Sequence, residues 1–481
     1  MILQKTAPYI LIFSILLLGG AAIAADPGAE PDPWATKQFT GDFGEMAKVR
    51  VVRALVPYSK TFYFLDRATA KGASHDMLKE FEKELNKTQK KKHLKTHVLI
   101  IPTARDKLLP NLQAGLGDLV VGNLTITKER QKKVDFSDPL FSGVDEIVVT
   151  GGNAAKLTSV SDLSGKTIHV RKSSSYYESL RSLNAKLSKE NKDVIILIPA
   201  DENLEDEDLL EMVNGGLIPM VVVDSHKAAF WGQIFKNIKI HSDIKINSGG
   251  NIAWAMRKKS PQLKKVVNSF VKKNKKGTLM GNILFKRYLQ NTKYVKNALS
   301  DAEIKRFNQT IEIFKKYSKD YNFDWLMIAA LSYQESGIDQ TKRSHAGAIG
   351  AMQILPSTAR DKNVNIPDIS KIDANIHAGT KYLRFMMDRY FADEKMDTVN
   401  KGLFSFASYN AGPAKVAKLR AEAAKMGLDP NIWFRNVEIV AAKRIGRETV
   451  QYVSNIYKYY VAYKLIVGNR ETLSKASAVK E

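Results

Sequence analysis

Glu335 is the residue of this chain that is best placed for acid–base chemistry. It lies near the end of an apolar stretch, residues 325–337, which follows Asp324 and closes on Gly337. Ala and Leu favour a helix, Asp324 can cap its start, and Gly337 suits the left-handed position just past its end. A helix that is apolar on all sides is a buried helix, so Glu335 is expected in the last turn of a buried helix.

This position predicts an acid with a raised pKa. Desolvation disfavours the carboxylate form of Glu335, and the negative end of the helix macrodipole disfavours it too. A carboxyl group that stays protonated near neutral pH can work as a general acid. The alternative is a solvated glutamate at a frayed helix end, which is the commoner situation for a single glutamate considered alone.

Further blocks after Glu335 decide between these readings. They are residues 347–359, 375–383, 407–413 and 448–453. Taken singly, each fits a loop and a helix start, in which Gly supplies special backbone angles and Met or Tyr fills the core. In this order and spacing, the blocks closely resemble the soluble-type lytic transglycosylase domain, a helical fold similar to goose-type lysozyme.

The resemblance implies a role for each matching residue. Glu335 corresponds to the single catalytic acid/base. The positions that match substrate-binding residues are Ser344, Met352, Gln353, Tyr409, Asn410 and Tyr452. Ser344 would help to hold the N-acetyl group of muramic acid, whereas Tyr409 and Asn410 would flank the scissile bond. A core-filling role stays open for Met352 and Tyr452.

The matching blocks supply one carboxylate, whereas a glycoside hydrolase usually needs two. The resemblance therefore implies non-hydrolytic cleavage of the β-1,4 bond between N-acetylmuramic acid and N-acetylglucosamine. Glu335 would protonate the glycosidic oxygen and then accept the proton of the C6 hydroxyl, which closes a 1,6-anhydro ring. A lysozyme-type hydrolase is the alternative enzyme. No cofactor and no metal ion is expected for either reaction.

A second site is expected in the N-terminal half. Thr125 ends a buried strand pattern, Arg130 follows five residues later, and residues 135–139 read Asp-Phe-Ser-Asp-Pro. This stretch resembles the amino-acid type of periplasmic solute-binding protein, in which Thr and Arg grip the ligand's carboxylate. The resemblance implies that Asp224 takes the ligand ammonium and that Ser174 closes over the carboxylate. Alternatively, Arg130 and Asp224 are structural and the cleft is vestigial.

The pattern of elements divides the chain. Strand and helix signals alternate from about residue 46 to 285, which predicts a parallel α/β sheet, and helices predominate from residue 301. The acidic run at 201–208 is expected to be a solvated face, since it lacks the spacing of a calcium loop. The expected fold class is multidomain: a two-lobed α/β periplasmic-binding-protein fold, then a mostly α, lysozyme-like domain.

The sequence signals predict six consecutive segments along the chain. They give a signal peptide at 1–24, an exposed leader at 25–45, the solute-binding domain at 46–285, a linker at 286–300, the transglycosylase domain at 301–468 and a polar tail at 469–481. Lys5, an apolar run at 9–18 and the small residues Ala22 and Ala24 are typical of a signal peptide cleaved after Ala24. An uncleaved N-terminal anchor is the alternative.

The amino-acid composition limits the kinds of partner that the protein can bind. The 481 residues contain 74 Lys and Arg against 50 Asp and Glu, a formal charge of +24, and no Cys. The absence of Cys excludes disulfides, thiolate metal sites and a lipid-modified N-terminal Cys. The charge suits a polyanion, which includes nucleic acid, an anionic membrane surface and the bacterial wall. Alternatively, the lysines only form solvated faces, because they are spread along the chain.

In this order, a signal peptide, a solute-binding domain and a lytic transglycosylase domain resemble the membrane-bound lytic murein transglycosylase F family. The resemblance implies a periplasmic enzyme with peripheral outer-membrane association, whose partner is the glycan strand of peptidoglycan and not nucleic acid. An amino acid or muropeptide in the N-terminal cleft would modulate it. The rival is a solute-binding sensor tethered to the wall by a glycan-binding domain, although such a tether need not keep Glu335.

Overall fold

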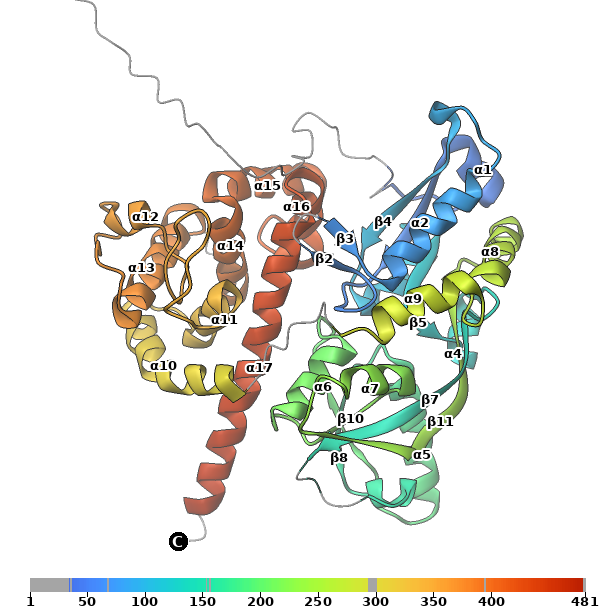
Figure 1. The fold of residues 1–481 in the computed structure, drawn as a ribbon, viewed down its shortest axis with the longest axis horizontal. Helices are drawn as coiled ribbons and strands as arrows, with labels where there is room; N and C mark the ends of the chain where they lie inside the picture. The colour runs from blue at the N-terminus through green and yellow to red at the C-terminus, as the bar shows by residue number, and fades with distance from the viewer. Residues whose placement is uncertain are drawn as a thin grey trace, which may run out of the picture.

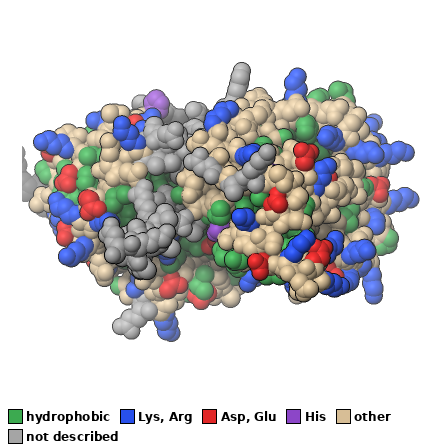
Figure 2. Space-filling view, turned by 90° about the horizontal axis from the view of Figure 1, so that it is seen from below, with side chains coloured by type: hydrophobic (Ala, Val, Ile, Leu, Met, Phe, Trp, Pro, Cys, Tyr) green, Lys and Arg blue, Asp and Glu red, His purple; other side chains and the backbone are tan. Residues whose placement is uncertain are grey.

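The computed structural model describes Trp34 and residues 37–66, 69–152, 154, 157–292, 301–392 and 395–478. The expected signal peptide lies outside these residues, as does most of the expected leader. An α/β domain is followed by a helical domain, which confirms the predicted fold class (Figure 1). None of the helices in the described part of the chain is both long enough and apolar enough to cross a membrane. Lys and Arg are scattered over the face shown in Figure 2 rather than gathered in one arm.

One mixed sheet forms the α/β domain and runs through two lobes. Its strands lie in the order β4-β1-β5-β11-β7-β10-β8-β9, and β6 (Asp135–Phe136) pairs with β11. Lobe 1 contains β1 (Val51–Val56), β4 (His97–Pro102) and β5 (Leu119–Thr125). Lobe 2 contains β8 (Thr167–Val170), β9 (Ile196–Pro199) and β10 (Met220–Asp224). Within each lobe these strands pair in parallel, as expected for a domain with alternating strands and helices.

Two long strands join the lobes, and they correct the expectation of a parallel sheet. β7 (Phe141–Gly151) and β11 (Ile238–Met256) run antiparallel to each other and to their neighbours β10 and β5. The first half of β11 is largely exposed, and its isoleucines alternate with polar residues, whereas its last five residues are all buried. The pairing of β11 with β7 also shifts register repeatedly after His241, as β-bulges do.

Helices cover the sheet of the α/β domain. They are α1 (Phe43–Val49), α2 (Ala73–Leu85), α3 (Leu108–Gln113), α4 (Lys128–Lys133), α5 (Ser175–Lys189), α6 (Asp206–Asn214), α7 (Ser225–Trp231), α8 (Pro261–Asn274) and α9 (Leu279–Leu289). A small hairpin is formed by β2 (Phe64–Asp66) and β3 (Thr69–Lys71). The Tyr288 hydroxyl of α9 donates to Asp76 of α2 at 2.8 Å. Helix α9 packs on this domain and ends at Leu289, four residues beyond the domain end expected at residue 285.

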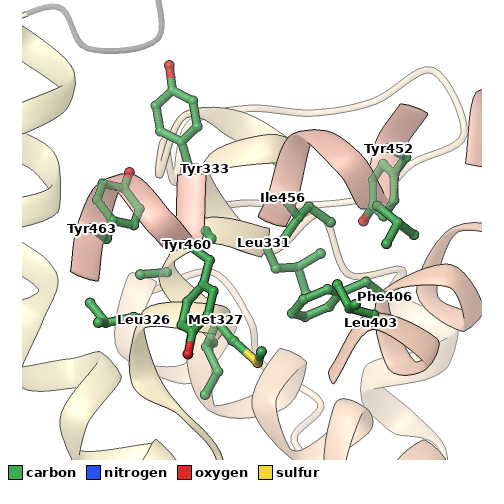
Figure 3. Packing of buried hydrophobic residues seen from close by; sticks show 14 of the residues in the cluster. Leu326, Met327, Leu331, Tyr333, Leu403, Phe406, Tyr452, Ile456, Tyr460 and Tyr463 are labelled. Atoms are coloured by element: carbon green, nitrogen blue, oxygen red, sulfur yellow. The ribbon is translucent and has the colours of Figure 1, made fainter. Parts of the chain in front are cut away.

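The helical domain is built around α11 (Trp325–Ser336), whose residues 326–333 are all buried. The helices around it are α10 (Asp301–Asp320), α12 (Pro356–Arg360), α13 (Ile372–Tyr390), α14 (Thr398–Ala411), α15 (Pro413–Lys425), α16 (Glu438–Arg444) and α17 (Arg447–Ala478). Figure 3 shows Leu331 of α11 beside Ile456 of α17 and Phe406 of α14 in the hydrophobic core. The tail expected from residue 469 continues α17 as far as Ala478.

Helix α17 lies between the two domains (Figure 1). Lys458 of α17 is 3.2 Å from Oδ2 of Asp208 in α6, and both side chains are buried. The Tyr457 hydroxyl donates to Asp201 at 3.0 Å, also in lobe 2. A continuous cluster of buried apolar residues extends from lobe 2 into the helical domain. The same helix therefore belongs to the core of the helical domain and to the junction with lobe 2.

Candidate active site and ligand cleft

Local signals fix both ends of α11 and thereby the position of Glu335. The carboxylate of Asp324 accepts the Leu326 N–H at 2.9 Å, as a helix cap does. Gly337 adopts the left-handed conformation with φ of 71°, and its N–H donates to the Tyr333 carbonyl at 2.8 Å. Both signals predicted from the sequence are thus confirmed, and Glu335 lies in the last turn of a buried helix.

The environment of Glu335 gives it the protonation behaviour of a general acid. Burial raises its pKa to about 7, and a hydrogen bond from the Tyr452 hydroxyl to Oε1 moderates this rise by favouring the carboxylate. Among the described residues, no second carboxylate contributes to the pKa of Glu335. The predicted direction is therefore confirmed, and burial is its main cause.

Two tyrosines from different helices stand close to Glu335. Tyr452 comes from α17, and Tyr409 comes from α14 and donates its hydroxyl hydrogen to the Met352 carbonyl at 2.7 Å. Burial and the charge of Glu335 raise the pKa of both hydroxyls well above the ordinary tyrosine value. Both phenols therefore stay protonated near neutral pH and can donate hydrogen bonds at the site.

A tight loop between α11 and α12 forms one side of the site, and Asn375 of α13 holds it. Asn375 is fully buried; its Oδ1 accepts the Met352 N–H at 2.8 Å, and its Nδ2 donates to the Ile349 carbonyl at 2.8 Å. Gln340 accepts the Ala351 N–H at 3.1 Å. Neither amide was assigned a role from the sequence. Asn375 begins one of the matching blocks, so its position was marked but its partners were not.

Met352, for which both a substrate-binding and a core-filling role were expected, lies in the core. Its side chain is fully buried and packs against Gly379 of α13, where a Cβ would come within 2.7 Å of its methyl carbon. This placement fits the core-filling alternative, and it is the Met352 carbonyl that contacts Tyr409.

The remaining predicted substrate residues lie at or near the surface. Ser344 is exposed in the loop, and its Oγ accepts the Ala348 N–H at 2.9 Å. The Gln353 side chain donates to the Gly350 carbonyl at 2.9 Å. Asn410 is exposed and accepts a hydrogen bond from Thr449 at 2.7 Å. Thr449 lies in a matching block, but its contact with Asn410 was not predicted from the sequence.

The predicted ligand residues of the α/β domain meet between the lobes. Arg130 donates through Nη1 to the Thr125 carbonyl at 2.9 Å and through Nη2 to the Ser173 carbonyl of lobe 2 at 3.0 Å. Ser174 caps α5 by accepting the Tyr177 N–H. Thr125, Arg130 and Ser174 line one cavity of about 20 Å³. Asp224 lies beside it and accepts a hydrogen bond from Asn123 of lobe 1 at 2.9 Å.

The acidic run contradicts the expectation of a solvated face. Its residues 205–208 are all buried, because cations from distant segments neutralise them. Arg105 pairs with Glu205, whereas Arg171 and Lys227 both pair with Asp206. These three cations also line the cavity, and none of them was predicted from the sequence. Lys227 follows Asp224 by about one helical turn, and this spacing was the sequence signal that could have predicted an ion pair between them.

Comparisons with known sequences agree with this two-part architecture. Residues 49–290 match the family described as bacterial extracellular solute-binding proteins, family 3, and residues 312–431 match the transglycosylase SLT domain. A membrane-bound lytic murein transglycosylase F of Desulfosudis oleivorans is 29% identical over 419 residues, which cover 83% of this chain and 86% of that protein. A protein of the same name from Pseudomonas fluorescens strain Pf0-1 is 28% identical, with 85% and 84% covered.

The chain is also similar to solved structures. The P235GK mutant of the arginine-binding protein from T. maritima is 23% identical, with a TM-score of 0.42, and the match covers 52% of this chain and 99% of that one. An ancestral arginine-binding protein bound to arginine is 23% identical with a TM-score of 0.40, and 50% and 97% of the two chains are covered.

Proposed function

The chain belongs to the membrane-bound lytic murein transglycosylase F family and is a peptidoglycan lytic transglycosylase, and we propose that Glu335 is its catalytic acid/base. The observation that carries this proposal is the half-buried position of Glu335 beside the Tyr452 hydroxyl, with a pKa of about 7. At that pKa the carboxyl group can give up a proton and take one back near neutral pH, as acid/base catalysis requires.

The proposed reaction uses this one carboxyl group twice. Glu335 donates its proton to the glycosidic oxygen as the β-1,4 bond between N-acetylmuramic acid and N-acetylglucosamine breaks. The acetamide of the substrate stabilises the positive charge at C1. The Glu335 carboxylate then takes the proton of the C6 hydroxyl while O6 bonds to C1, which forms the 1,6-anhydro ring and restores the acid. The Tyr452 hydrogen bond stabilises the carboxylate between these steps.

Four side chains are proposed to contact the glycan strand. Tyr409 and Asn410 follow one another at the end of α14, near Glu335. Ser344 and Gln353 belong to the loop that Asn375 holds, and Ser344 is open to solvent. Met352 acts in this proposal through its carbonyl, which fixes the Tyr409 hydroxyl.

Product analysis tests the reaction. Purified peptidoglycan is digested with the wild-type protein, with Glu335→Gln and with Glu312→Gln, and soluble products are identified by mass spectrometry. Glu312 is a matched control in the same domain, since its side chain is 84% exposed. Anhydromuramyl products from wild type and Glu312→Gln alone would support the proposal. Reducing-end products would instead indicate a hydrolase, and no product from any protein would favour the tethered sensor.

We also infer that the α/β domain, which we take to end with α9, binds a ligand carboxylate and modulates the helical domain, which we take to begin with α10. Arg130, Thr125 and Ser174 would hold the carboxylate of an amino acid or muropeptide. The support is the junction: Lys458 and Tyr457 contact lobe 2 from α17, the helix that carries Tyr452. Ligand-dependent product release by wild type, lost in Arg130→Ala, is the expected result. Release that no added ligand changes would contradict modulation.

The protein is associated with the cell envelope, as its relatives' names indicate. We propose export to the periplasm with cleavage after Ala24 and peripheral association with the outer membrane, with glycan strands rather than nucleic acid as the polyanionic partner. N-terminal sequencing of the mature protein and fractionation of membranes with salt washes would test this. An N-terminus at Met1 would contradict the cleavage.

A further inference from the structure

Lys227 places a positive charge inside the closed cleft, at the position expected for a ligand ammonium. The residue is 3% exposed, and its Nζ pairs with Oδ2 of Asp206 and lies 3.5 Å from Oδ2 of Asp224. Asn123 of lobe 1 donates to the same Oδ2 of Asp224 at 2.9 Å. The carboxylate that was expected to receive the ammonium of a free amino acid thus already has a cation from its own chain.

The charges that line the cavity between the lobes also favour an anionic ligand over a cationic one. Its lining contains four cationic side chains, Arg105, Arg130, Arg171 and Lys227, but one carboxylate, Asp206. Nε of Arg171, a residue 2% exposed, has no hydrogen-bond partner among the described residues. Arg105, Arg171 and Lys227 already pair with Glu205 or Asp206, whereas Arg130 lies 3.7 Å from its carboxylate neighbour Glu178 and is the cation left for an anionic group. The charge of Lys227 repels a second ammonium, since charges interact strongly where water is excluded.

We propose that Lys227 serves as an internal substitute for the ligand ammonium, so that the cleft selects carboxylates whose neighbouring nitrogen is acylated and rejects free amino acids. This inference rests on the carboxylate-binding function proposed above for Arg130. Its chemistry fits an N-acyl amino acid and equally the C-terminal residue of a longer peptide, because both present a carboxylate beside an amide.

The geometry also shows what binding must change. The cavity of about 20 Å³ has room for about one water molecule, so the lobes must separate to admit a ligand. Contacts that cross between the lobes would open, including Asn123 with Asp224 and Arg130 with the Ser173 carbonyl. A ligand carboxylate can then take Arg130 as its partner, whereas Lys227 keeps Asp206 and Asp224, which belong to its own lobe.

Calorimetry on the full chain with matched ligands tests the proposal. The probes are alanine, glutamate, lysine and arginine, each as the free amino acid and as its N-acetyl derivative, together with N-acetyl-dialanine for the peptide case. Wild type is expected to bind at least one acetylated probe tenfold or more tighter than its free form. A tighter Kd for N-acetyl-dialanine than for N-acetylalanine would identify the peptide as the source.

Variants of Lys227 show whether it is the cause. Lys227→Gln leaves Asp224 without a cation and is expected to raise the affinity for a free amino acid tenfold or more. Lys227→Arg keeps the charge and should keep the wild-type preference. Adding Asp224→Asn to Lys227→Gln should remove the gained affinity. Far-UV circular dichroism and thermal unfolding of the same preparations report whether the variant chains fold.

The outcomes separate this inference from the function on which it rests. If wild type binds free and acetylated probes equally well, or if Lys227→Gln leaves the preference unchanged, Lys227 does not select the ligand, although the cleft still binds carboxylates. If no protein binds any probe, both proposals fail. The wild-type comparison decides the question even if Lys227→Gln does not fold.

Discussion

The Tyr452 hydroxyl donates a hydrogen bond to Oε1 of Glu335, which lies 117 positions earlier in the chain. The contact exists because α11 and α17 pack along one another in the hydrophobic core. Six residues after Tyr452, Lys458 pairs with Asp208 of lobe 2. The proposed acid is therefore bonded to a helix that also contacts the solute-binding domain.

Replacing Tyr452 by Phe should shift the pH dependence of activity upward. The hydrogen bond favours ionised Glu335, so its loss raises a pKa that now stands at about 7. Because the reaction needs protonated Glu335, kcat/KM of the variant should fall at a higher pH than that of wild type. Rates of anhydromuropeptide release from pH 5 to 9 measure this. Tyr460→Phe, which removes a hydroxyl bonded to Asp324 on the same helix face, is the control. An unshifted alkaline limb would contradict the assignment.

Glu335→Gln should stabilise the protein in alkaline solution. The pKa of Glu335 rises from 4.5 to about 7 on folding, so the folded state holds more protons between these values and stability is lost as pH rises through them. A Gln side chain does not ionise, so it avoids the free-energy cost of placing a carboxylate at this desolvated position. The variant should therefore be more stable than wild type above pH 7 by at most about 3 kcal/mol, and nearly as stable as wild type below pH 4.5. Urea unfolding at pH 4.5 and pH 8 compares the two. Equal stability at both values would show that Glu335 is not buried as described.

Gly350→Ala should destabilise the active-site loop more than Gly347→Ala. Both glycines have positive φ, 78° and 84°, so both substitutions carry similar backbone strain. A Cβ on Gly350, however, would lie 2.5 Å from Oε1 of Gln340 and 2.6 Å from Nδ2 of Asn375, whereas one on Gly347 meets nothing within 4 Å. The difference in unfolding free energy should be about 1–3 kcal/mol, the usual cost of overpacking. Thermal unfolding with activity assays checks it, and equal losses would mean that the two amides do not hold the loop.

Lys458 and Asp208 should show a measurable energetic coupling. Burial would raise the pKa of Asp208, yet Lys458 and Lys60 lower it to about 2. A double-mutant cycle of Lys458→Met with Asp208→Asn is therefore expected to give an interaction energy of about 1–3 kcal/mol. The exposed pair Lys316 and Asp373, 3.9 Å apart, provides the comparison and should give less than about 0.5 kcal/mol. Similar values for the two pairs would argue against a fixed junction between α17 and lobe 2.

The sequence by itself determined the features that act over a single turn or a single block. Asp324 and Gly337 mark the ends of α11, and the position of Glu335 at the end of a buried helix follows from the apolar residues before it. The alternation of strands and helices likewise revealed the α/β domain, and the ordered blocks after Glu335 revealed the helical one. Each of these signals works because its cause, a cap or an apolar face, lies within a few residues of its effect.

Only the tertiary structure decided which distant groups meet. Residues 205–208 are acidic and looked solvated, but Arg105, Arg171, Lys227 and Lys458 reach them from other elements and allow their burial. The isoleucines at 238, 240, 244 and 246 alternate with polar residues as in a strand, but nothing near them in the chain shows that this strand pairs antiparallel with β7. Burial of a charge depends on a partner of opposite sign, and that partner can stand anywhere in the chain. The position of Lys227 beside Asp224, and with it the charge of the ligand cleft, is for this reason a property of the folded protein.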